Sequence, residues 1–591
     1  MSEQTVKIKR DYSMFDADLS GAVLNVSLLG RLLSWLKPYR GQLVLSSVLV
    51  LVASFLNILL PITISLVAID YIIRTEPTTN APDFGLIELN DWLSQSLSIH
   101  PLLAACLMYA VCHSLWAAIA HAHRMTLIGA VVKGLRDLRN DLFAHLETRP
   151  SSFYDRVAVG RVMTRVTNDV EALYELLRGL GTLIGEFVPF LVALTVMFAI
   201  NTELTLTLLI ALPLLTIVTF YFRSITRRLF RQVRQTVSTL NQSLQENLAG
   251  LEVVQLSDRQ QLNFERYTKT NTENRNYETK LARVETLYGA FNDSLAHAAI
   301  GVIIWFSANL VMETSMSLGE VVLFTQFIGM LFNPIVVLGE QTNILFRAMA
   351  SGERIFQALD WDEKIHEPRH PIVLPERLKG EVTFNSVNFS YDEDTPVLKD
   401  VSFKINPGEK LAIVGPTGSG KSTLIRLLSR FYDFNDNLIF LDGIDLNKIL
   451  SKDLRSRVGV VLQDFHIFSG SILDNLTLGN PKISQEKAIL AAKTVNAHTF
   501  IEGLEEGYHS ILSERGQNLS QGQRQLLAFA RVLAADPEIL VLDEATASID
   551  TETELLIQDA LRKLKLRGAE KLTLDLRDNP GGYLGIAEKL A

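Results

Sequence analysis

Six stretches of the sequence carry no Asp, Glu, Lys or Arg over a length that soluble helices seldom reach. A helix needs roughly 20 apolar residues to cross the hydrocarbon core of a bilayer, and each stretch reaches or approaches that length. A buried soluble helix could imitate one stretch, but not six. We therefore predict six transmembrane helices within the runs between Arg40 and Asp70 and between Asp91 and Arg124, and within residues 187–202, 204–222, 294–312 and 321–339.

The rest of the composition indicates a second part that is soluble in water. Hydrophobic residues make up 48% of the chain, which is high for a soluble protein, yet 20% of the residues are charged, which is high for a purely membrane-buried one. A chain of 591 residues also exceeds one compact core. The net charge of -9 gives no reason to expect a nucleic acid as a partner. We expect a membrane domain, surrounded by bilayer lipid, joined to a soluble domain.

The basic residues between the runs predict the orientation of the spans. Nine Lys and Arg lie from Arg124 to Arg178 and eleven from Arg223 to Asn292, whereas residues 70–91 hold one base and five acids. Loops rich in Lys and Arg remain in the cytoplasm. We therefore expect both termini and both long basic segments, read as charged helical extensions, in the cytoplasm. The predicted location is the cell membrane, a bacterial inner membrane, with the protein crossing it several times.

Four ionisable residues lie inside the runs or at their borders, namely Asp70, His121, His123 and Glu186. An ionisable group within a membrane is by default a functional hypothesis. We interpret all four as interfacial or snorkelling groups, because nothing in their arrangement resembles a proton relay.

From about residue 380 the sequence changes to short β-rich runs separated by turn residues. Leu411–Gly415 has the pattern of a buried strand and leads into GPTGSGKST, after which a helical run follows. Strand, glycine-rich loop and helix in this order are typical of a phosphate-binding loop, whose backbone N–H groups converge on phosphate oxygens at the positive end of the helix. The loop residues predicted to bind ATP are Gly415, Pro416, Thr417, Gly418, Ser419, Gly420, Lys421, Ser422 and Thr423.

A second strand-like run, Glu538–Ala545, ends in two adjacent carboxylates, Asp543 and Glu544. We predict that Ser422 and Asp543 ligate Mg²⁺, that Lys421 neutralises the phosphates, and that Glu544 polarises the attacking water. A solvated acidic turn would be the better interpretation if the phosphate loop were absent. With the loop present, ATP hydrolysis assisted by Mg²⁺ is favoured.

The run LSQGQRQ, residues 519–525, lies between these two motifs. Together with the phosphate loop it makes the sequence resemble the ATP-binding cassette (ABC) exporters, specifically the multidrug- and lipid-exporting half-transporters whose membrane domain is fused to a cassette. The resemblance covers about residues 20–564. In the membrane half, SFYDRVAVGRVMTRVTNDVEAL and LNQSLQENLAGLEVVQL resemble the cytoplasmic coupling regions of this family.

The resemblance implies roles for further residues. Tyr391 matches the aromatic residue that stacks on adenine, and Gln463 matches the catalytic-site glutamine that senses Mg²⁺ and the membrane domain. Asp550 matches a loop that communicates between the two ATP sites. The signature loop, which in this family contacts the γ-phosphate held by the opposite subunit, is matched by Ser520, Gly522 and Gln523.

A signature loop contributes nothing to the ATP of its own chain, so the resemblance implies a second half-transporter as an obligatory partner. Two cassettes would then hold two nucleotides between them, and their closure would turn the membrane halves from inward- to outward-facing. The partner is either an identical chain or a different one. Gln521, where the signature commonly has glycine, slightly favours a different one.

These observations predict an α-helical six-span membrane domain of the exporter type. An α/β phosphate-loop ATPase domain with an α-helical subdomain follows, and its C-terminal end is expected to be incomplete. The expected bounds are 1–30 for a cytoplasmic tail, 31–350 for the membrane domain, 351–379 for a linker, 380–566 for the cassette and 567–591 for an atypical segment.

The end of the sequence departs from the family. ABC exporters have a switch histidine on a strand roughly 30 residues after the catalytic glutamate, but the last of the eleven histidines is His509. The strand-like KLTLDLRDN places Asp575 there instead, and a carboxylate would repel the phosphate. The last 20 or so residues resemble a segment of the C-terminal processing peptidases without the nucleophile of that family. We hypothesise that foreign sequence is joined to the cassette near residues 564–568.

The predicted function is ATP-driven export of an amphiphilic small molecule, a drug or a lipid, by one half of a dimeric transporter. The alternative is a subunit that binds ATP but does not hydrolyse it, or a truncated product without function, because the switch histidine and the end of the cassette are missing.

Overall fold

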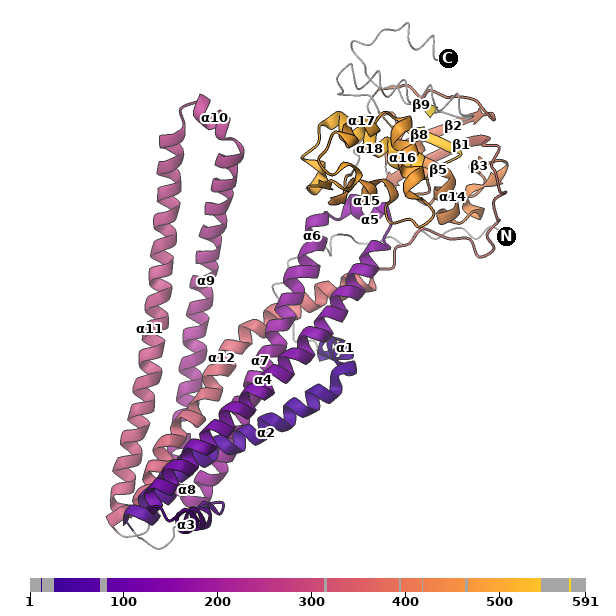
Figure 1. Cartoon of the computed structure of the whole chain (residues 1–591). Coiled ribbons are helices and arrows are strands. Elements are labelled where there is room, and N and C mark those ends of the chain that lie inside the picture. Colours follow the sequence, from indigo (N-terminus) through magenta and orange to yellow (C-terminus); the bar gives the residue numbers. More distant parts are fainter. Residues whose placement is uncertain are drawn as a thin grey trace. The chain divides into compact units, whose positions relative to one another are not determined.

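The computed structural model of the chain describes residues 12, 26–74, 82–312, 316–392, 395–416, 418–462, 466–543 and 573–574 (Figure 1). It divides into two compact units. One comprises Met1–Glu147 and Val157–Trp361, and the other Thr148–Arg156 and Asp362–Ala591. We call them the membrane unit and the cassette unit. The short segment Thr148–Arg156 lies in the membrane half of the sequence but packs with the cassette unit.

The membrane unit is entirely helical in its described residues. A helix that satisfies its own backbone N–H and C=O groups is the only open-chain structure that can span a bilayer. The elements are α1 (Val26–Leu36), η2 (Lys37–Tyr39), α2 (Arg40–Ile62), η3 (Thr63–Arg74), α3 (Leu86–Leu97), α4 (Pro101–Glu147), α6 (Val159–Thr164), η4 (Arg165–Asp169), α7 (Val170–Ile200), α8 (Thr202–Leu209), α9 (Ala211–Ala249), α10 (Leu251–Leu256), α11 (Gln260–Met312) and α12 (Leu318–Asp360).

Six helical segments in the described residues are long and apolar enough to cross a membrane, which confirms the prediction from the uncharged runs. The first runs from α1 through η2 and α2 into the π-helical η3, and each of the others extends beyond its uncharged run. The segments are Ser27–Ile73, Pro101–Glu147, Val159–Ile200, Thr202–Ala249, Gln260–Met312 and Leu318–Asp360. The chain is therefore a multi-pass membrane protein.

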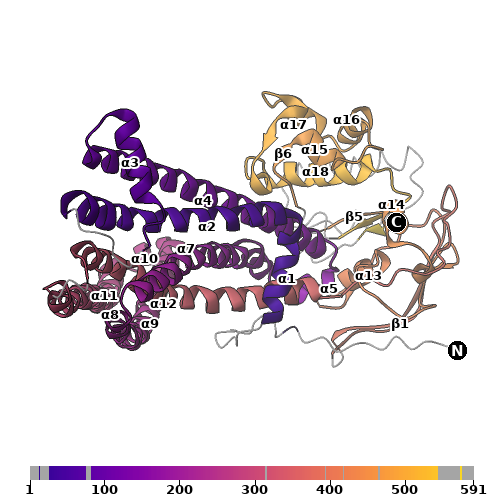
Figure 2. The ribbon, with the colours of Figure 1, turned by 90° about the horizontal axis from the view of Figure 1, so that it is seen from below.

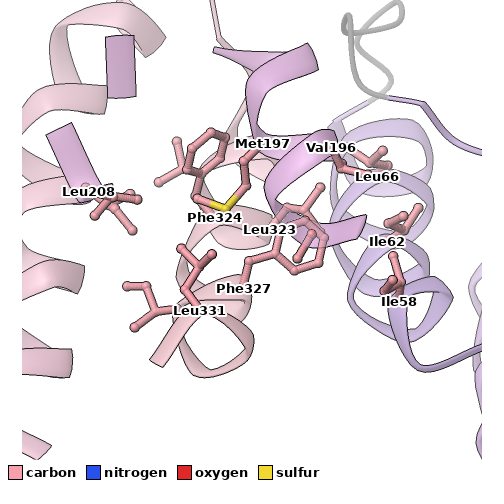
Figure 3. Packing of buried hydrophobic residues seen from close by; sticks show 14 of the residues in the cluster. Ile58, Ile62, Leu66, Val196, Met197, Leu208, Leu323, Phe324, Phe327 and Leu331 are labelled. Carbon is pink, nitrogen blue, oxygen red and sulfur yellow. The ribbon is translucent and has the colours of Figure 1, made fainter. Parts of the chain in front are cut away.

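A cluster of buried apolar side chains holds the spans together (Figure 3). The last helix, α12, supplies its centre with Phe324 and Phe327, neither of which is exposed at all. Residues of the first span, such as Ile62, lie on one side of these rings, and Met197 of α7 and Leu208 of α8 lie on others. Three other spans thus fix the position of α12 partly through apolar packing.

Asp70 and His123 are buried, so they do not extend outward as the snorkelling interpretation expects. The Asp70 carboxylate accepts hydrogen bonds from the Ser317 hydroxyl at 2.5 Å and from the Gly319 backbone N–H at 2.7 Å. It therefore satisfies N–H groups at the first turn of α12, where a helix has no internal acceptor for them. The Nδ1 atom of His123 lies 2.9 Å from the Ser46 hydroxyl. Both groups join one span to another.

Helices α9 and α11 form a long antiparallel pair that α10 joins at one end (Figures 1 and 2). Their seam is partly polar. The Thr219 and Tyr288 hydroxyls are 3.0 Å apart, and the Thr236 hydroxyl donates to the Asn274 amide oxygen at 2.7 Å. The length and charge of this pair agree with the helical extensions predicted for the basic segment that begins at Arg223.

The cassette unit contains α5 (Ser151–Arg156) and, from residue 362 on, a mixed α/β domain. Its strands are β1 (Val382–Asp392), β2 (Thr395–Ile405), β3 (Ile439–Leu441), β4 (Ile444–Asp445), β5 (Val458–Val461), β6 (Gly470–Ser471), β7 (Ile511–Leu512), β8 (Ile539–Leu542) and β9 (Thr573–Leu574). Its helices are α13 (Lys421–Leu428), η5 (Leu446–Lys448), α14 (Ser451–Arg457), α15 (Ile472–Thr477), α16 (Gln485–Thr494), α17 (His498–Glu502), η6 (Gly507–His509), η7 (Glu514–Gly516) and α18 (Gln521–Ala534).

Two hydrophobic clusters divide this domain. The first packs α13 and α14 against an antiparallel sheet of order β2-β1-β3-β4 and against the parallel strands β5 and β8. The second gathers α15, α16, α17 and α18 with the β6–β7 pair. An α/β core with a helical subdomain was predicted, and this part of the fold class is confirmed.

The buried strand predicted at Leu411–Gly415 is not formed. Only Ala412 makes a single β-bridge, and Val414 is exposed. The parallel sheet of described residues runs β5-β8-β9, and β9 has only two residues.

Candidate functional site

The phosphate loop turns sharply into α13 because two of its glycines take a left-handed conformation. Gly418 has φ of 82° and Gly420 has φ of 89°, which side chains rarely tolerate. A Cβ atom on Gly420 would also lie 2.6 Å from a methyl carbon of Leu398 on β2. The first N–H groups of α13 therefore follow directly on a loop that only glycine can form, and this positive helix end suits an anion.

Lys421, the first residue of α13, is folded into the loop. Its side chain is only 4% exposed, and its ammonium group donates to the Gly415 carbonyl, to the Pro416 carbonyl at 2.7 Å and to the Ser419 hydroxyl at 3.2 Å. The loop thus surrounds one positive charge. Such an arrangement fits a group with several negative oxygens, and it agrees with the phosphate contacts predicted for these residues.

Tyr391 lies at the end of β1, close to the same helix. Its hydroxyl donates to the Thr423 hydroxyl at 3.0 Å, so the aromatic residue predicted to stack on adenine is attached to the helix that follows the phosphate loop. Its ring meets those of Phe389 and Tyr432 edge to face, with centroids 5.1 and 4.9 Å away. Two aromatic neighbours and one hydrogen bond therefore fix the ring in place.

Arginine side chains bind the backbone at the far end of α13. Arg455 donates to the carbonyls of Ser429 at 3.1 Å and Arg430 at 2.7 Å, just beyond the last turn. Arg430, only 1% exposed, donates to the carbonyls of His366 and Ile449. Burial lowers the pKa of Arg455. Cations at a helix C-terminus are favourable, so both ends of this short helix are stabilised.

Asp543 follows β8 directly and is buried. Its backbone N–H donates to the Val461 carbonyl of β5 at 2.9 Å, which extends the parallel β5–β8 ladder by one residue. The predicted Mg²⁺ ligand is therefore held on the carboxyl end of the central strand, where ligands bind in open α/β sheets. Ser422, its predicted co-ligand, lies in the first turn of α13.

The predicted signature residues form the N-terminus of α18. Ser520 is the N-cap: its hydroxyl accepts from the Gln523 N–H at 3.2 Å, and the Gln523 side-chain oxygen accepts from the Ser520 N–H at 2.9 Å. This is a capping box. Gly522 is buried, whereas Ser520 and Gln521 are exposed. The positive end of a 14-residue helix is thus presented at the surface of its own chain.

Arg531, on the same helix, binds the segment that follows the predicted glutamine loop. It donates to the carbonyls of His466 at 2.7 Å and Asn475 at 2.8 Å, and to the Asn475 side-chain oxygen at 3.0 Å. Burial lowers the pKa of Arg531. The signature helix and the chain after residue 465 are therefore tied together by one charged side chain.

Helix α5 contacts both nucleotide-binding elements of the cassette unit. Arg156 donates to the Tyr391 carbonyl at 2.7 Å and pairs with Asp392 at 3.0 Å, while Asp155 pairs with Arg426 of α13 at 3.3 Å. Phe153 is fully buried. The cytoplasmic turn after the second span is thus attached to the adenine-side aromatic residue and to the phosphate-loop helix.

Four of the predicted site residues, namely Thr417, Gln463, Glu544 and Asp550, lie outside the residues that the structure describes, as does the atypical segment 567–591 apart from β9. The others are brought together in two places: around α13 and the end of β8, and at the start of α18. Among the described residues, no group of three or more His, Cys, Asp or Glu is placed to hold a metal ion by itself.

The chain matches two known protein families, one in each half of its sequence. Residues 43–335 match the ABC transporter transmembrane region, and residues 398–547 match the ABC transporter cassette. The chain belongs to the ABC exporter family. It joins the transmembrane region to the ATPase domain in one polypeptide, so it is a membrane-embedded ATPase that drives export.

Curated relatives extend over the same length. The chain is 35% identical to the ABC transporter ATP-binding protein YknV of Bacillus subtilis, with 91% of this chain and 86% of the relative covered. It is 30% identical to YgaD of the same organism, a protein named for multidrug export, over 91% and 90%. A protein of Mycobacterium bovis named a fatty acid ABC transporter is 35% identical, over 82% and 74%.

Sequence reasoning missed the residues that connect the elements of this ABC exporter. The coupling region around α5 was recognised, but not the contacts of Asp155 and Arg156, nor Arg426 and Arg531. A guanidinium that binds backbone carbonyls leaves no motif, because its partners are fixed by folding and not by residue type. The run of charges in DRVAVGR was the one available signal.

Proposed function

We propose that the chain is one half of a dimeric exporter, in which ATP held by each phosphate loop is contacted by the signature helix of the other subunit. The observation that carries this proposal is the exposed N-terminus of α18. Its capping box leaves the positive helix end at the surface of the cassette unit, where an oxyanion outside this chain's own fold can meet it. The nucleotide itself would lie on the loop around Lys421 and beside Tyr391.

The residues present fit ATP with Mg²⁺. A Cβ on Gly420 would clash with Leu398, so glycine at this position allows the tight turn of the loop, and the loop surrounds the Lys421 ammonium with oxygen groups that anionic oxygens can replace. Mg²⁺ prefers oxygen ligands and keeps part of its shell for water and phosphate, so the Ser422 hydroxyl, the Asp543 carboxylate and the Gln463 amide oxygen suffice for the protein's share. The ion would neutralise charge on the β- and γ-phosphates.

A second feature, in the membrane unit, supports a partner subunit. Helix α10, at the tip of the α9–α11 pair, buries none of its residues. Two of them are apolar and largely exposed, with Val253 65% exposed and Leu256 88% exposed. Adjacent exposed apolar side chains at the end of a long cytoplasmic extension are typical of a protein interface. The second cassette of a dimer would bury them.

The substrate we propose is an amphiphilic small molecule, a drug or a lipid. The spans present large apolar side chains with scattered polar groups and no described cluster of ionisable residues that would select an ion. Two relatives carry names that refer to multidrug export and to fatty acid transport, and both kinds of molecule are amphiphilic. Uptake of dye or fatty acid into inverted vesicles, with and without ATP, would distinguish these classes.

Complementation between two defective variants tests the composite site. Lys421→Ala disables one phosphate loop, and Ser520→Arg places a bulky cation at one signature. Each purified variant alone should lose ATP turnover, whereas mixed dimers carry one site with both parts intact and should recover part of it. If the mixture stays as inactive as the separate variants while the unmodified chain is active, the shared site is wrong. Glu544→Gln should retain ATP binding and lose turnover.

A hydrolysis-deficient subunit is the second candidate, and one observation favours it. Strand β9 pairs in parallel with β8, with Thr573 opposite Val541 and Leu574 opposite Leu542. This is the place that the sequence comparison assigned to the switch strand, and the next residue in the sequence is Asp575 instead of histidine. Under this reading Asp575→His should raise ATP turnover of the purified chain about tenfold or more, as an added transition-state donor does. An unchanged rate would remove this candidate.

A further inference from the structure

Four exposed arginines follow the fourth span on α9, and we call them the α9 arginine stripe. The apolar run of that span ends at Phe222. No member of the stripe forms an ion pair with any residue in the described part of the chain, whereas the preceding Arg223 pairs with Glu340 at 3.1 Å. The stripe consists of Arg227, Arg228, Arg231 and Arg234.

The stripe lies on the side of α9 that faces away from α11. Thr219 and Thr236 contact α11, and Leu240, one turn beyond Thr236 on the same side of α9, is buried. Arg227, Arg231 and Arg234 are related by steps of four and three residues, so they form one row. Arg231 lies five residues before the seam residue Thr236, which is about 140° around the helix.

The acidic residues close to the stripe are engaged elsewhere. The antiparallel pairing of Thr236 with Asn274 brings Glu278 of α11 to the level of Arg231, but the Glu278 carboxylate accepts from the Asn274 amide at 3.0 Å. Glu340 of α12 pairs with Arg223. Neither of these carboxylates, nor any other in the described part of the chain, forms an ion pair with the stripe.

We propose that the α9 arginine stripe binds the headgroups of anionic phospholipids in the cytoplasmic leaflet. Arg227 follows the apolar run by five residues and Arg234 by twelve, which corresponds to about 8 and 18 Å along the helix. Helical side chains tilt toward the N-terminus of their helix, which for α9 is its membrane end, so the guanidinium groups extend back toward the headgroup layer. Clusters of four to eight bases at this position are typical of anionic-lipid binding.

Aromatic residues at the same level support a lipid as the occupant. Phe220 and Tyr221 are exposed at the end of the apolar run, and Phe230 is exposed between the arginines. Aromatic side chains favour the membrane–water interface, where an apolar ring and a polar surrounding meet. An acidic protein surface would complement the charges of the stripe, but it would not explain apolar rings beside them. The bound phospholipid is a fixed component of this site and is distinct from any transported molecule.

The experiment uses the full chain, purified in neutral detergent in the oligomeric state in which it exists. Phosphatidylglycerol or phosphatidylcholine is titrated in, and the bound lipids are counted by native mass spectrometry. The unmodified protein should bind phosphatidylglycerol more tightly, and the preference should weaken as salt is raised. The variant R227Q/R228Q/R231Q/R234Q should lose at least about tenfold in affinity for phosphatidylglycerol, because each base near an anionic surface contributes about fivefold.

A matched control removes four bases further along the same helical pair, in R259Q/R266Q/K269Q/R275Q, all of which are exposed. It should bind phosphatidylglycerol as the unmodified protein does. The four-lysine variant R227K/R228K/R231K/R234K keeps the charge and should also bind, which separates lipid binding from loss of folding. Equal losses in the stripe and control variants would overturn the proposal. So would an unchanged lipid preference in the stripe variant, with or without dissociation of the oligomer, which would assign the stripe to a protein interface.

Discussion

The two cytoplasmic turns α5 and α10 have similar lengths and similar positions between spans, yet their surroundings are opposite. Helix α5 packs into the cassette unit of its own chain, with Phe153 fully buried and ion pairs to Asp392 and Arg426. Helix α10 buries nothing and exposes Val253 and Leu256. Helix α5 therefore packs on a surface of its own chain. Helix α10 exposes apolar residues that no described residue covers.

This difference shows how one chain can both position its own nucleotide and depend on another. Contacts of α5 reach Tyr391 and α13, so under our proposal they affect ATP binding in the same polypeptide. Contacts of α10, under our proposal, would act on the partner's cassette. Variants of α5 should therefore change stability and ATP affinity, while variants of α10 should change only the coupling between subunits.

The largest expected effect comes from removing the buried ring of α5. Phe153→Ala should destabilise the cassette unit by about 3–5 kcal/mol, the range found for truncating a buried phenylalanine. The thermal unfolding midpoint of the purified chain measures this loss. As a control, Phe264→Ala on α11 removes a ring that is exposed and should change stability by no more than about 0.5 kcal/mol. Equal losses in both variants would break the comparison.

The second test places charge on α10. In the double variant Val253→Asp and Leu256→Asp, ATP turnover and transport in proteoliposomes should fall roughly a hundredfold, because two apolar contacts worth about 1.5 kcal/mol each are lost. The unfolding midpoint should stay the same, since neither residue is buried within the chain. Val253→Ile with Leu256→Met keeps the surface apolar and should preserve activity. Normal turnover in the aspartate variant would show that α10 docks nowhere.

A smaller effect is expected where α5 meets the adenine-side loop. Arg156→Gln loses the ion pair with Asp392 and weakens the hydrogen bond to the Tyr391 carbonyl, so the Tyr391 ring is held less firmly. We expect KM for ATP to rise about three- to tenfold, which corresponds to the net loss of one ordinary hydrogen bond of about 1 kcal/mol, with kcat nearly unchanged. Arg161→Gln, at an exposed position on α6, serves as the matched control. A fall in kcat at constant KM would contradict a positioning role.

The smallest effect should come from the ion pair between Asp155 and Arg426. Both side chains are a little under half exposed, and the pair is 3.3 Å long. Solvent screens such pairs, so a double-mutant cycle with Asp155→Asn and Arg426→Gln should give a coupling energy below about 1 kcal/mol. A coupling well above this, measured from the unfolding midpoints, would mean that charge and not the Phe153 ring attaches α5 to the cassette.

The membrane half could be predicted from sequence because its determining signal is the absence of charge over a fixed length. Every uncharged run places most of its residues in a span, and the basic segment after Arg223 forms much of the α9–α11 pair. Asp70 was harder. Its acidity predicted a position at the interface, while its partners Ser317 and Gly319 lie nearly 250 residues away, and no local pattern indicates such a contact.

In the cassette, the residues of the phosphate-loop motif could be predicted from sequence, but the residues that pack against them could not. Gly418, Gly420 and Lys421 are recognisable since only these residues can form such a loop. The strand predicted at Leu411–Gly415 was wrong because a strand needs hydrogen bonds to a partner strand, which a local sequence pattern does not identify. Arg531 went unnoticed because a guanidinium that binds carbonyls accepts any residue as its partner.

Helix α5 also shows that the units of this exporter are not continuous pieces of chain. In a chimera joined near residue 362, the cassette of another transporter would face Asp155 and Arg156 of this chain. It would lack the helix of its own protein that corresponds to α5. The exchangeable module consists of Thr148–Arg156 together with the chain from Asp362 onward. The same constraint applies in evolution. Substitutions in these nine residues should be tolerated only when they preserve contact with the cassette, independently of the transported substrate.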